Sequence, residues 1–298
     1  MTILYLLEDI RTPLLNNLVS LITHLGSEVF LLVGSLVVLW TIDKKWGYYL
    51  LFVASVGTTT NQFLKNLFAV ARPWIIDPEF TVVEQAKAGA TGYSFPSGHT
   101  QTAVGFFGGI IRLTDHRLIR MLSLFMILAV SFSRMYLGVH TVYDVGVSIL
   151  IGFVLVVLIH PIFFKYDKVY HSMIIGTIIA LLYVIYMEVK LQNAVMSEIE
   201  LDALKNAYTV FGLALAIPVI YHVDTKYLKY PTEAVWWAQL VKCIIGLSLM
   251  LTLRIVLKQP LYVITNGHNI ADMIRYFILA VSGGLLWPIT FKWFKRLS

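Results

Sequence analysis

Long apolar stretches, separated by short polar segments, dominate this sequence. A helix needs roughly 20 apolar residues to cross a hydrocarbon core about 30 Å thick, and nine stretches reach or approach that length. Because a helix satisfies its own backbone hydrogen bonds in lipid, the pattern predicts an all-α integral membrane protein, a bundle of about nine transmembrane helices. The nine stretches are residues 28–42, 48–68, 99–113, 121–137, 142–164, 172–189, 203–222, 234–257 and 270–292.

A shorter helical pattern precedes the first long stretch. Between residues 13 and 25, apolar side chains recur three and four positions apart, which gives a helix one apolar face. A helix of this kind favours the plane of the membrane surface. We therefore expect three regions: an N-terminal interfacial helix in 1–27, a core with five spans in 28–165, and a C-terminal extension of about four spans in 166–298.

Composition agrees with a membrane protein. Of the 298 residues, 58% are hydrophobic and only 13% are charged, whereas soluble domains carry about 25% charged residues. The net charge of +6 does not indicate nucleic-acid binding, because the basic residues are scattered instead of forming long runs. The single cysteine, Cys243, cannot form an intrachain disulfide. The oligomeric state stays open.

The distribution of charge between loops predicts the orientation of the chain. Lysine and arginine prefer cytoplasmic loops. Basic clusters occur at 44–45, 112–120, 165–168, 226–229 and 292–296, whereas acidic residues gather in the intervening loops at 8–9, 77–84 and 198–202. We therefore expect the amino terminus outside the cytoplasm and the carboxy terminus inside it.

Several cations also lie on the outer side, and three of them are at span ends within one half of the chain. Lys65 and Arg72 are about two helical turns apart, so both face one way near the end of the second stretch. Arg134 ends the fourth stretch. A single cation at such a position is usually an anchor at the membrane interface. Three of them in one half of the chain indicate an anion site instead.

Two further segments supply groups suited to an anion. Pro96-Ser97-Gly98-His99 opens the third stretch, and a helix start exposes free N–H groups that attract anions. Glycine at position 98 allows a ligand to approach the backbone closely. His140 precedes Asp144 by four residues, so the carboxylate can hold one imidazole nitrogen while the other attacks. Each segment alone has an ordinary structural explanation, but together they describe an oxyanion site.

These segments resemble the three signatures of the type 2 phosphatidic acid phosphatase family. They are Lys65…Arg72-Pro73, Pro96-Ser97-Gly98-His99 and Ser133-Arg134…His140…Asp144, and the resemblance covers roughly residues 48–164. It implies that His140, oriented by Asp144, attacks phosphorus and forms a phosphohistidine. His99 would protonate the leaving group and then activate water. The groups implied to hold the phosphate oxygens are Lys65, Arg72, Arg134, the Ser97 hydroxyl and the Gly98 N–H.

The resemblance implies a phosphatase for lipid phosphates or pyrophosphates. The charge distribution places its site on the outer side, so we expect it to act at the outer leaflet of a bacterial plasma membrane. We expect a polyprenyl pyrophosphate, a phosphatidate or a phosphatidylglycerophosphate as substrate. We expect no cofactor and no metal, because the remaining histidines are dispersed and the outer carboxylates lack ligand spacing.

Two alternatives remain open. Many bacterial members have about six spans, and a nine-span layout is similar to that of glucose-6-phosphatase and the sphingosine-phosphate phosphatases. A sphingoid-phosphate or sugar-phosphate phosphatase is therefore the first alternative. A non-catalytic lipid-phosphate binder or transporter is the second, although the complete set of candidate catalytic residues argues against it.

Two other features have no assigned role at this point. The loop 77–95 connects two signature segments, and it is either a lid over the site or a passive linker. Lys242 and Arg254 lie within the eighth apolar stretch. Charges inside a membrane segment are often functional, but a long basic side chain can also reach the interface along its own stem.

Overall fold

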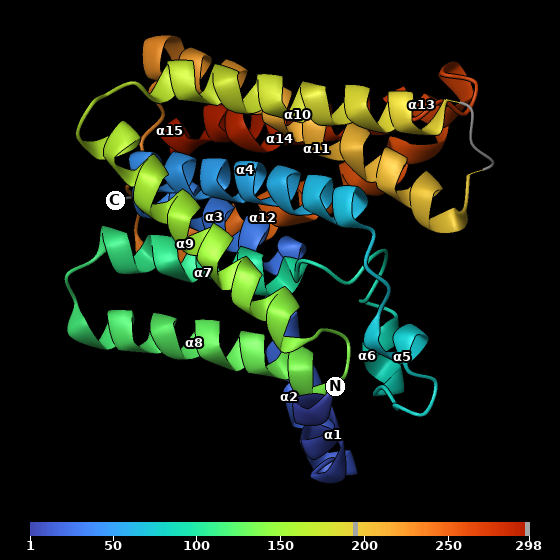
Figure 1. Ribbon diagram of the computed structural model, residues 1–298. Helices are drawn as coiled ribbons and strands as arrows, with labels where there is room; N and C mark the ends of the chain where they lie inside the picture. Colours follow the sequence, from blue (N-terminus) through green and yellow to red (C-terminus); the bar gives the residue numbers. More distant parts are fainter. Residues whose placement is uncertain (193–195, 296–298) are drawn as a thin grey trace. The chain divides into compact units, whose positions relative to one another are not determined.

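The computed structural model describes residues 1–192 and 196–295, and the regular elements in that part of the chain are helices (Figure 1). This confirms the prediction of an all-α protein. Arg296, counted above among the cytoplasmic basic residues, lies outside the described residues.

The elements of the first half of the chain are α1 (Thr2–Asp9), α2 (Pro13–His24), α3 (Glu28–Thr41), α4 (Lys44–Phe68), α5 (Pro73–Ile76), α6 (Glu84–Lys87), α7 (Gly98–Leu113), α8 (Arg117–Tyr136) and α9 (Val142–Phe164). Those of the second half are α10 (Val169–Leu191), α11 (Glu198–Val223), the π-helix η1 (Asp224–Leu228), α12 (Trp236–Val256), α13 (Lys258–Ile264), α14 (Ile270–Val281), the π-helix η2 (Ser282–Leu286), the 3₁₀-helix η3 (Trp287–Thr290) and α15 (Phe291–Lys295).

The number of membrane spans differs from the prediction of nine. Among the described residues, six helices are long and apolar enough to cross a membrane, or up to seven if the bent pair α2 and α3 is one span. Helices α3 and α7 have 14 and 16 residues, so they extend only about 21 and 24 Å at 1.5 Å per residue. Helix α4 is long enough, but its sequence Thr58-Thr59-Thr60-Asn61-Gln62 is polar. The chain is an integral membrane protein, and the nine-span layout is not confirmed.

The N-terminal region contains two helices in place of the single interfacial helix that we expected. Thr12 caps α2 by accepting a hydrogen bond from the Leu15 amide, and Pro13 occupies the first helical position. Helix α2 meets α3 at 46°, and the two together are long and apolar enough to form one broken span. The exposed leucines of α2, among them Leu14, Leu18 and Leu21, therefore suit either an interfacial helix or half of a bent span.

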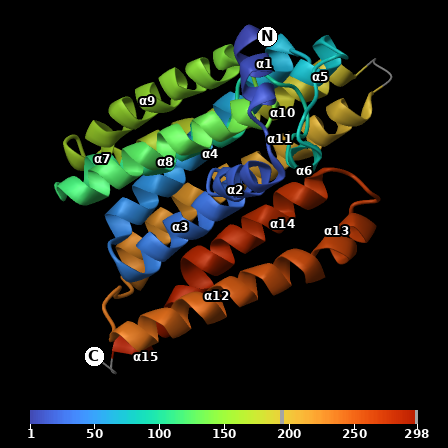
Figure 2. The ribbon, with the colours of Figure 1, turned by 90° about the horizontal axis from the view of Figure 1, so that it is seen from below.

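The structure divides into two compact units, and the first contains Met1–Leu32, Gly57–His160 and Met196–Ala203. Within it α7 packs against α8, which also contacts α1 and α2 (Figures 1 and 2). A buried apolar cluster joins α2, the 83–90 segment and the end of α8; its members are Val19, Val83, Ala86, Ala90, Tyr136, Leu137 and Val139. This cluster anchors part of the loop between two signature segments.

The second unit contains Val33–Val56, Pro161–Val195 and Leu204–Ser298. Within it α12 packs against α14 and η2, and α13 packs against α14 (Figure 2). Buried Asp224 accepts hydrogen bonds from Lys44 Nζ at 2.9 Å and from the Tyr48 hydroxyl at 3.0 Å. Lys242 is fully buried, where its Nζ donates to Thr232 O at 2.9 Å. These partners give Lys242 a structural role, whereas Arg254 is exposed.

Candidate active site

The residues of the three signature segments all lie in the first compact unit. Local helix geometry explains most of their positions. Lys65 is in the last turn of α4, and Arg72 is the N-cap of α5, just before Pro73. The other candidates lie at the ends of α7, α8 and α9: Ser97 as the N-cap of α7, Gly98 and His99 in its first turn, Arg134 in the last turn of α8, His140 in the following connection, and Asp144 in the first turn of α9.

Asp144 is placed by the capping of α9. The Thr141 amide donates to Asp144 Oδ2 at 2.7 Å, and the Asp144 amide donates to Thr141 Oγ1 at 3.2 Å. This reciprocal pair is a capping box, with threonine three residues ahead of an acidic residue. The same Oδ2 lies 3.5 Å from His140 Nδ1. The helix cap therefore directs the carboxylate toward the imidazole.

The contacts of His140 determine which ring nitrogen carries the proton. Arg72 Nη1 is 3.0 Å from His140 Nε2, and because a guanidinium only donates hydrogen bonds, Nε2 must be the acceptor. The neutral ring consequently carries its proton on Nδ1, which faces Asp144. Burial, followed by the charges of Arg72, Arg134 and Lys65, holds the pKa of His140 well below its ordinary value of 6.5. The imidazole is thus neutral at physiological pH, with its lone pair on Nε2.

The cluster brings the basic side chains of Lys65, Arg72 and Arg134 together with the Asp144 carboxylate. Lys65, Arg72 and Arg134 are between 1% and 6% exposed. Burial lowers the pKa of Arg72 to about 10, and the charge of Asp144 opposes that shift. The guanidinium therefore remains charged at neutral pH. A buried excess of positive charge is costly unless an anion compensates it, so this geometry suits an anionic ligand.

Backbone carbonyls of the 91–93 segment contact two of the cations. Arg72 donates from Nε to Gly92 O at 3.1 Å and from Nη2 to Thr91 O at 2.7 Å. Lys65 Nζ donates to Tyr93 O at 2.5 Å. These oxygens hold both side chains in place. The segment is consequently a wall of the cluster.

Arg134 uses one donor on the N-terminal region and retains another without a partner in the described part of the chain. Its Nη1 donates to Thr23 Oγ1 at 2.7 Å, while its Nε is buried and has no partner among the described residues. The α2–α3 connection also approaches α7 closely, because a Cβ added at Gly26 would lie 3.1 Å from His99 O. The N-terminal region therefore contributes to this cluster through Thr23.

The Pro-Ser-Gly-His turn forms the start of α7, as the sequence indicated. Ser97 Oγ donates to Thr100 Oγ1 at 3.0 Å and caps the helix by accepting from the Thr100 amide. The hydroxyl is thus engaged in capping, and its contact with phosphate stays a prediction. His99 is partly exposed, and burial, followed by the charges of Arg134 and Lys65, lowers its pKa to about 2. The negative charge of a bound phosphate would oppose that shift.

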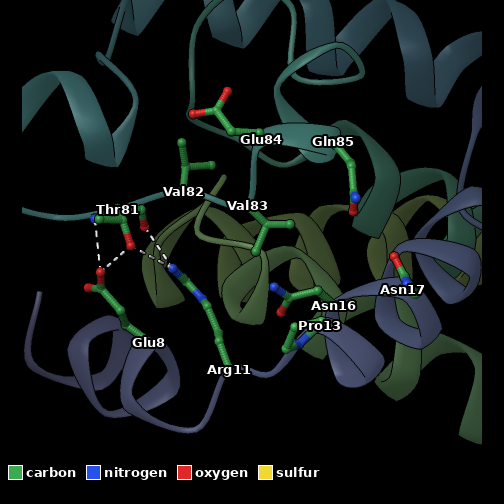
Figure 3. A pocket seen from close by; sticks show the side chains of 10 residues that line it. All are labelled: Glu8, Arg11, Pro13, Asn16, Asn17, Thr81, Val82, Val83, Glu84 and Gln85. Atoms are coloured by element: carbon green, nitrogen blue, oxygen red, sulfur yellow. Dashed lines mark hydrogen bonds between the residues drawn. The ribbon is translucent and has the colours of Figure 1, made fainter.

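The loop 77–95 is tied to α1 by several hydrogen bonds, shown in part in Figure 3. Tyr5 donates to Asp77 Oδ2 at 2.9 Å, and the Thr81 amide and hydroxyl donate to Glu8. Arg11 Nη1 donates to Thr81 O at 2.8 Å, and its Nε donates to Tyr136 O at 2.9 Å. These bonds, with the carbonyl contacts of 91–93, favour a fixed wall over a mobile lid.

A pocket of about 470 Å³ lies beside the hydrogen bonds that join α1 to the 77–95 loop (Figure 3). It is lined by Glu8, Arg11, Pro13, Asn16, Asn17, Thr81, Val82, Val83, Glu84 and Gln85. None of the predicted site residues lines it. The pocket is therefore separate from the candidate catalytic cluster.

Sequence reasoning missed three contributors to the cluster. Ser94 contacts both His140 and Asp144, Thr23 binds Arg134, and the 91–93 carbonyls bind the other two cations. Ser94 stands two residues ahead of a signature segment, which was a weak indication. Backbone carbonyls have no signature of their own, and Thr23 is far from the other residues in sequence.

An all-helical membrane protein with a buried cationic cluster fits a membrane phosphatase, and comparison with known proteins shows that class. The PAP2 superfamily model matches residues 45–168, and the model described as PAP2 superfamily phosphatase, transmembrane extension, matches residues 208–297. The chain belongs to the PAP2 superfamily, and it is a phosphatase or diphosphatase.

Two curated relatives carry names of lipid phosphatases. Phosphatidylglycerophosphatase B of Bacillus subtilis (strain 168) is 30% identical over 165 residues, which are 50% of this chain and 76% of that protein. Undecaprenyl-diphosphatase of Sulfolobus acidocaldarius is 28% identical over 140 residues, which are 46% of this chain and 66% of that protein. No solved structure matches the chain.

Proposed function

We propose that this phosphatase acts through a phosphohistidine on His140 Nε2. The observation that supports this most is the Arg72 Nη1 contact at 3.0 Å, which requires a lone pair on that nitrogen. Nδ1–H then faces Asp144, whose negative charge stabilises the imidazolium that forms after attack. His140 is the nucleophile, and Asp144 orients it.

The proposed reaction has two balanced steps. In the first, the Nε2 lone pair forms an N–P bond while the P–O bond to the lipid alcohol or to the departing phosphate breaks, and His99 supplies the proton to the leaving oxygen. In the second, His99 removes a proton from water, whose oxygen attacks phosphorus. The N–P bond breaks, inorganic phosphate is released, and His140 is neutral again.

The remaining site residues are proposed to bind the transferring phosphoryl group. Arg134 Nε has an unused donor, and the start of α7 presents the Gly98 N–H at the positive end of a helix. The 91–93 carbonyls hold Lys65 and Arg72 in place. The charges of these two side chains act on the oxygens of the phosphoryl group. Phosphoryl transfer needs mainly positioning and charge stabilisation, so we propose a reaction without a metal or cofactor. Ser97 completes the set through its hydroxyl.

The proposed substrates are a polyprenyl pyrophosphate or a phosphatidylglycerophosphate, with phosphatidate next. The names of the two relatives support the first two. We further propose that the active site faces the extracytoplasmic side of a bacterial plasma membrane, because basic loops elsewhere in the chain indicate the cytoplasmic side. The division into 1–27, 28–165 and 166–298 is also a proposal, supported by family models that match separate parts of the chain.

Phosphate release by the purified protein tests this proposal. The panel contains undecaprenyl diphosphate, phosphatidylglycerophosphate, phosphatidate, a sphingoid phosphate and glucose 6-phosphate, each with excess chelator. We expect turnover of at least one of the first three and none by His140→Ala. A preference for the sphingoid or sugar phosphate would support that alternative substrate class. Lipid phosphate binding without release would favour a non-catalytic binder, and a strict requirement for added metal would contradict the mechanism.

A further inference from the structure

Ser94 is a buried serine that contacts the His140–Asp144 pair from outside the three signature segments. Ser94 is only 1% exposed. The Ser94 hydroxyl donates to Asp144 Oδ2 at 2.7 Å, and Ser94 Oγ also lies 3.5 Å from His140 Nδ1. Because an ionised carboxylate only accepts hydrogen bonds, the single Ser94 proton is committed to Asp144.

The bonds at Asp144 Oδ2 show what this hydroxyl adds. The Thr141 amide and the Ser94 hydroxyl each lie 2.7 Å from Oδ2, whereas His140 Nδ1 lies 3.5 Å away. Two short bonds from different chain segments therefore set the position of this oxygen, and the imidazole contact is the looser one. Ser94 Oγ also places a lone pair near Nδ1–H. The proton on Nδ1 thus faces two acceptors, Asp144 Oδ2 and Ser94 Oγ.

Ser94 is itself anchored by the chain on both sides. Its amide donates to Val70 O at 2.8 Å, and the preceding carbonyls of Thr91, Gly92 and Tyr93 accept hydrogen bonds from Arg72 and Lys65. One short segment therefore contacts both the cations and the carboxylate. This continuity fixes the distance between the phosphate-binding groups and the nucleophile's partner.

We propose that Ser94 is a positioning residue for the nucleophile: by holding Asp144 Oδ2 it keeps the proton of His140 on Nδ1 and so leaves the lone pair that attacks phosphorus on Nε2. This inference rests on the proposed role of His140. It adds a fourth segment, 91–94, to the three that the sequence indicated. Ser94 does not touch the reacting atoms, and it acts through Asp144.

The Ser94→Ala variant measures this role. We expect kcat to fall on the order of 10- to 100-fold, as for a lost hydrogen bond to a charged group, with KM changed less than about twofold. Ser94→Cys retains the volume but has only a weak donor, so it should lose kcat to a similar extent. Recovery of full activity by cysteine would show that Ser94 only fills space, and would overturn the proposal.

A matched control and a double variant separate positioning from general damage. Ser148 is also fully buried and donates to Asp144, but to its backbone carbonyl at 2.6 Å. Ser148→Ala should therefore leave kcat within about twofold. In an Asp144→Asn background, Ser94→Ala should cost much less than in the wild type, because both changes remove one interaction.

Three further outcomes would contradict the inference, and each differs from failure of the proposed function. They are an unchanged kcat in Ser94→Ala, an equal loss in Ser148→Ala, and full additivity with Asp144→Asn. In each case His140→Ala would still be inactive. If His140→Ala itself retained turnover, the proposed nucleophile would be wrong. If Ser94→Ala failed to fold, Ser94→Cys and its double variant with Asp144→Asn would supply the same comparisons.

Discussion

At the scale of single residues, the site depends on an asymmetry between the two nitrogens of His140. Arg72 donates to Nε2, while Nδ1 faces Asp144. The i, i+4 spacing of His140 and Asp144 predicted part of this arrangement, because it places both residues at one helix start. The Arg72 contact was not predictable from spacing, since Arg72 and His140 are brought together by the 91–93 carbonyls and by Val139 O. Such contacts depend on backbone geometry that residue types do not encode.

The low pKa of His140 has a consequence for stability. Above about pH 6.5 the imidazole is neutral in both the folded and the unfolded chain, so it contributes no pH dependence. Below that pH the unfolded chain binds a proton that buried His140 resists, because burial and the neighbouring cations hold its pKa down. Stability attributable to His140 should therefore be lost as the pH falls from 6.5.

Thermal unfolding in detergent checks this expectation. The midpoints of wild-type protein and His140→Gln are compared at pH 7.5 and pH 5.0, so that contributions from other groups cancel. We expect the wild type to lose more than the variant on acidification. Equal losses, or a larger loss in the variant, would show that the imidazole takes up a proton in the folded state as readily as in water.

At the scale of elements, helices were predicted more reliably than their relation to the membrane. Apolar runs located every long helix, because hydrophobic periodicity is strong over such lengths. The runs did not distinguish a full span from a short or polar helix, and α3, α4 and α7 are examples.

The loop 77–95 had no interpretable pattern, because its structure depends on hydrogen bonds to α1 and on a close approach to Gly138. Gly138 has a φ of +80°, and a Cβ there would lie 3.0 Å from the ring of Phe80 in this loop.

Arg11 should be the main tie between the N-terminal region and this loop. Arg11→Ala removes the bonds to Thr81 O and Tyr136 O and should destabilise the protein by about 1–3 kcal/mol. Amide hydrogen exchange at residues 79–90 should become faster. Lys87→Ala is the matched control, because exposed Lys87 pairs only with Glu84 among the described residues. If both variants exchanged at the wild-type rate, the loop would be held by its apolar cluster instead.

At the scale of the whole molecule, the charge distribution predicts sidedness independently of the signatures. Exposed residues at both predicted surfaces provide labelling positions. With Cys243 replaced by serine, Glu79→Cys should react with a membrane-impermeant thiol reagent on intact cells. Lys168→Cys should react only after the membrane is opened. The reverse pattern would place the active site at the cytoplasmic face and remove the argument for a substrate in the outer leaflet.

Detection of the covalent intermediate tests the central claim most directly. An aryl phosphate, whose leaving group needs no proton, is mixed with wild-type protein and with His99→Ala, and the reaction is quenched within one turnover. We expect an acid-labile phosphoryl group that mass spectrometry places on His140, with more of it in His99→Ala because water is not activated there. Asp144→Asn should form it slowly, and His140→Ala should form none. A phosphoryl group on another residue, or turnover in His140→Ala, would contradict this account.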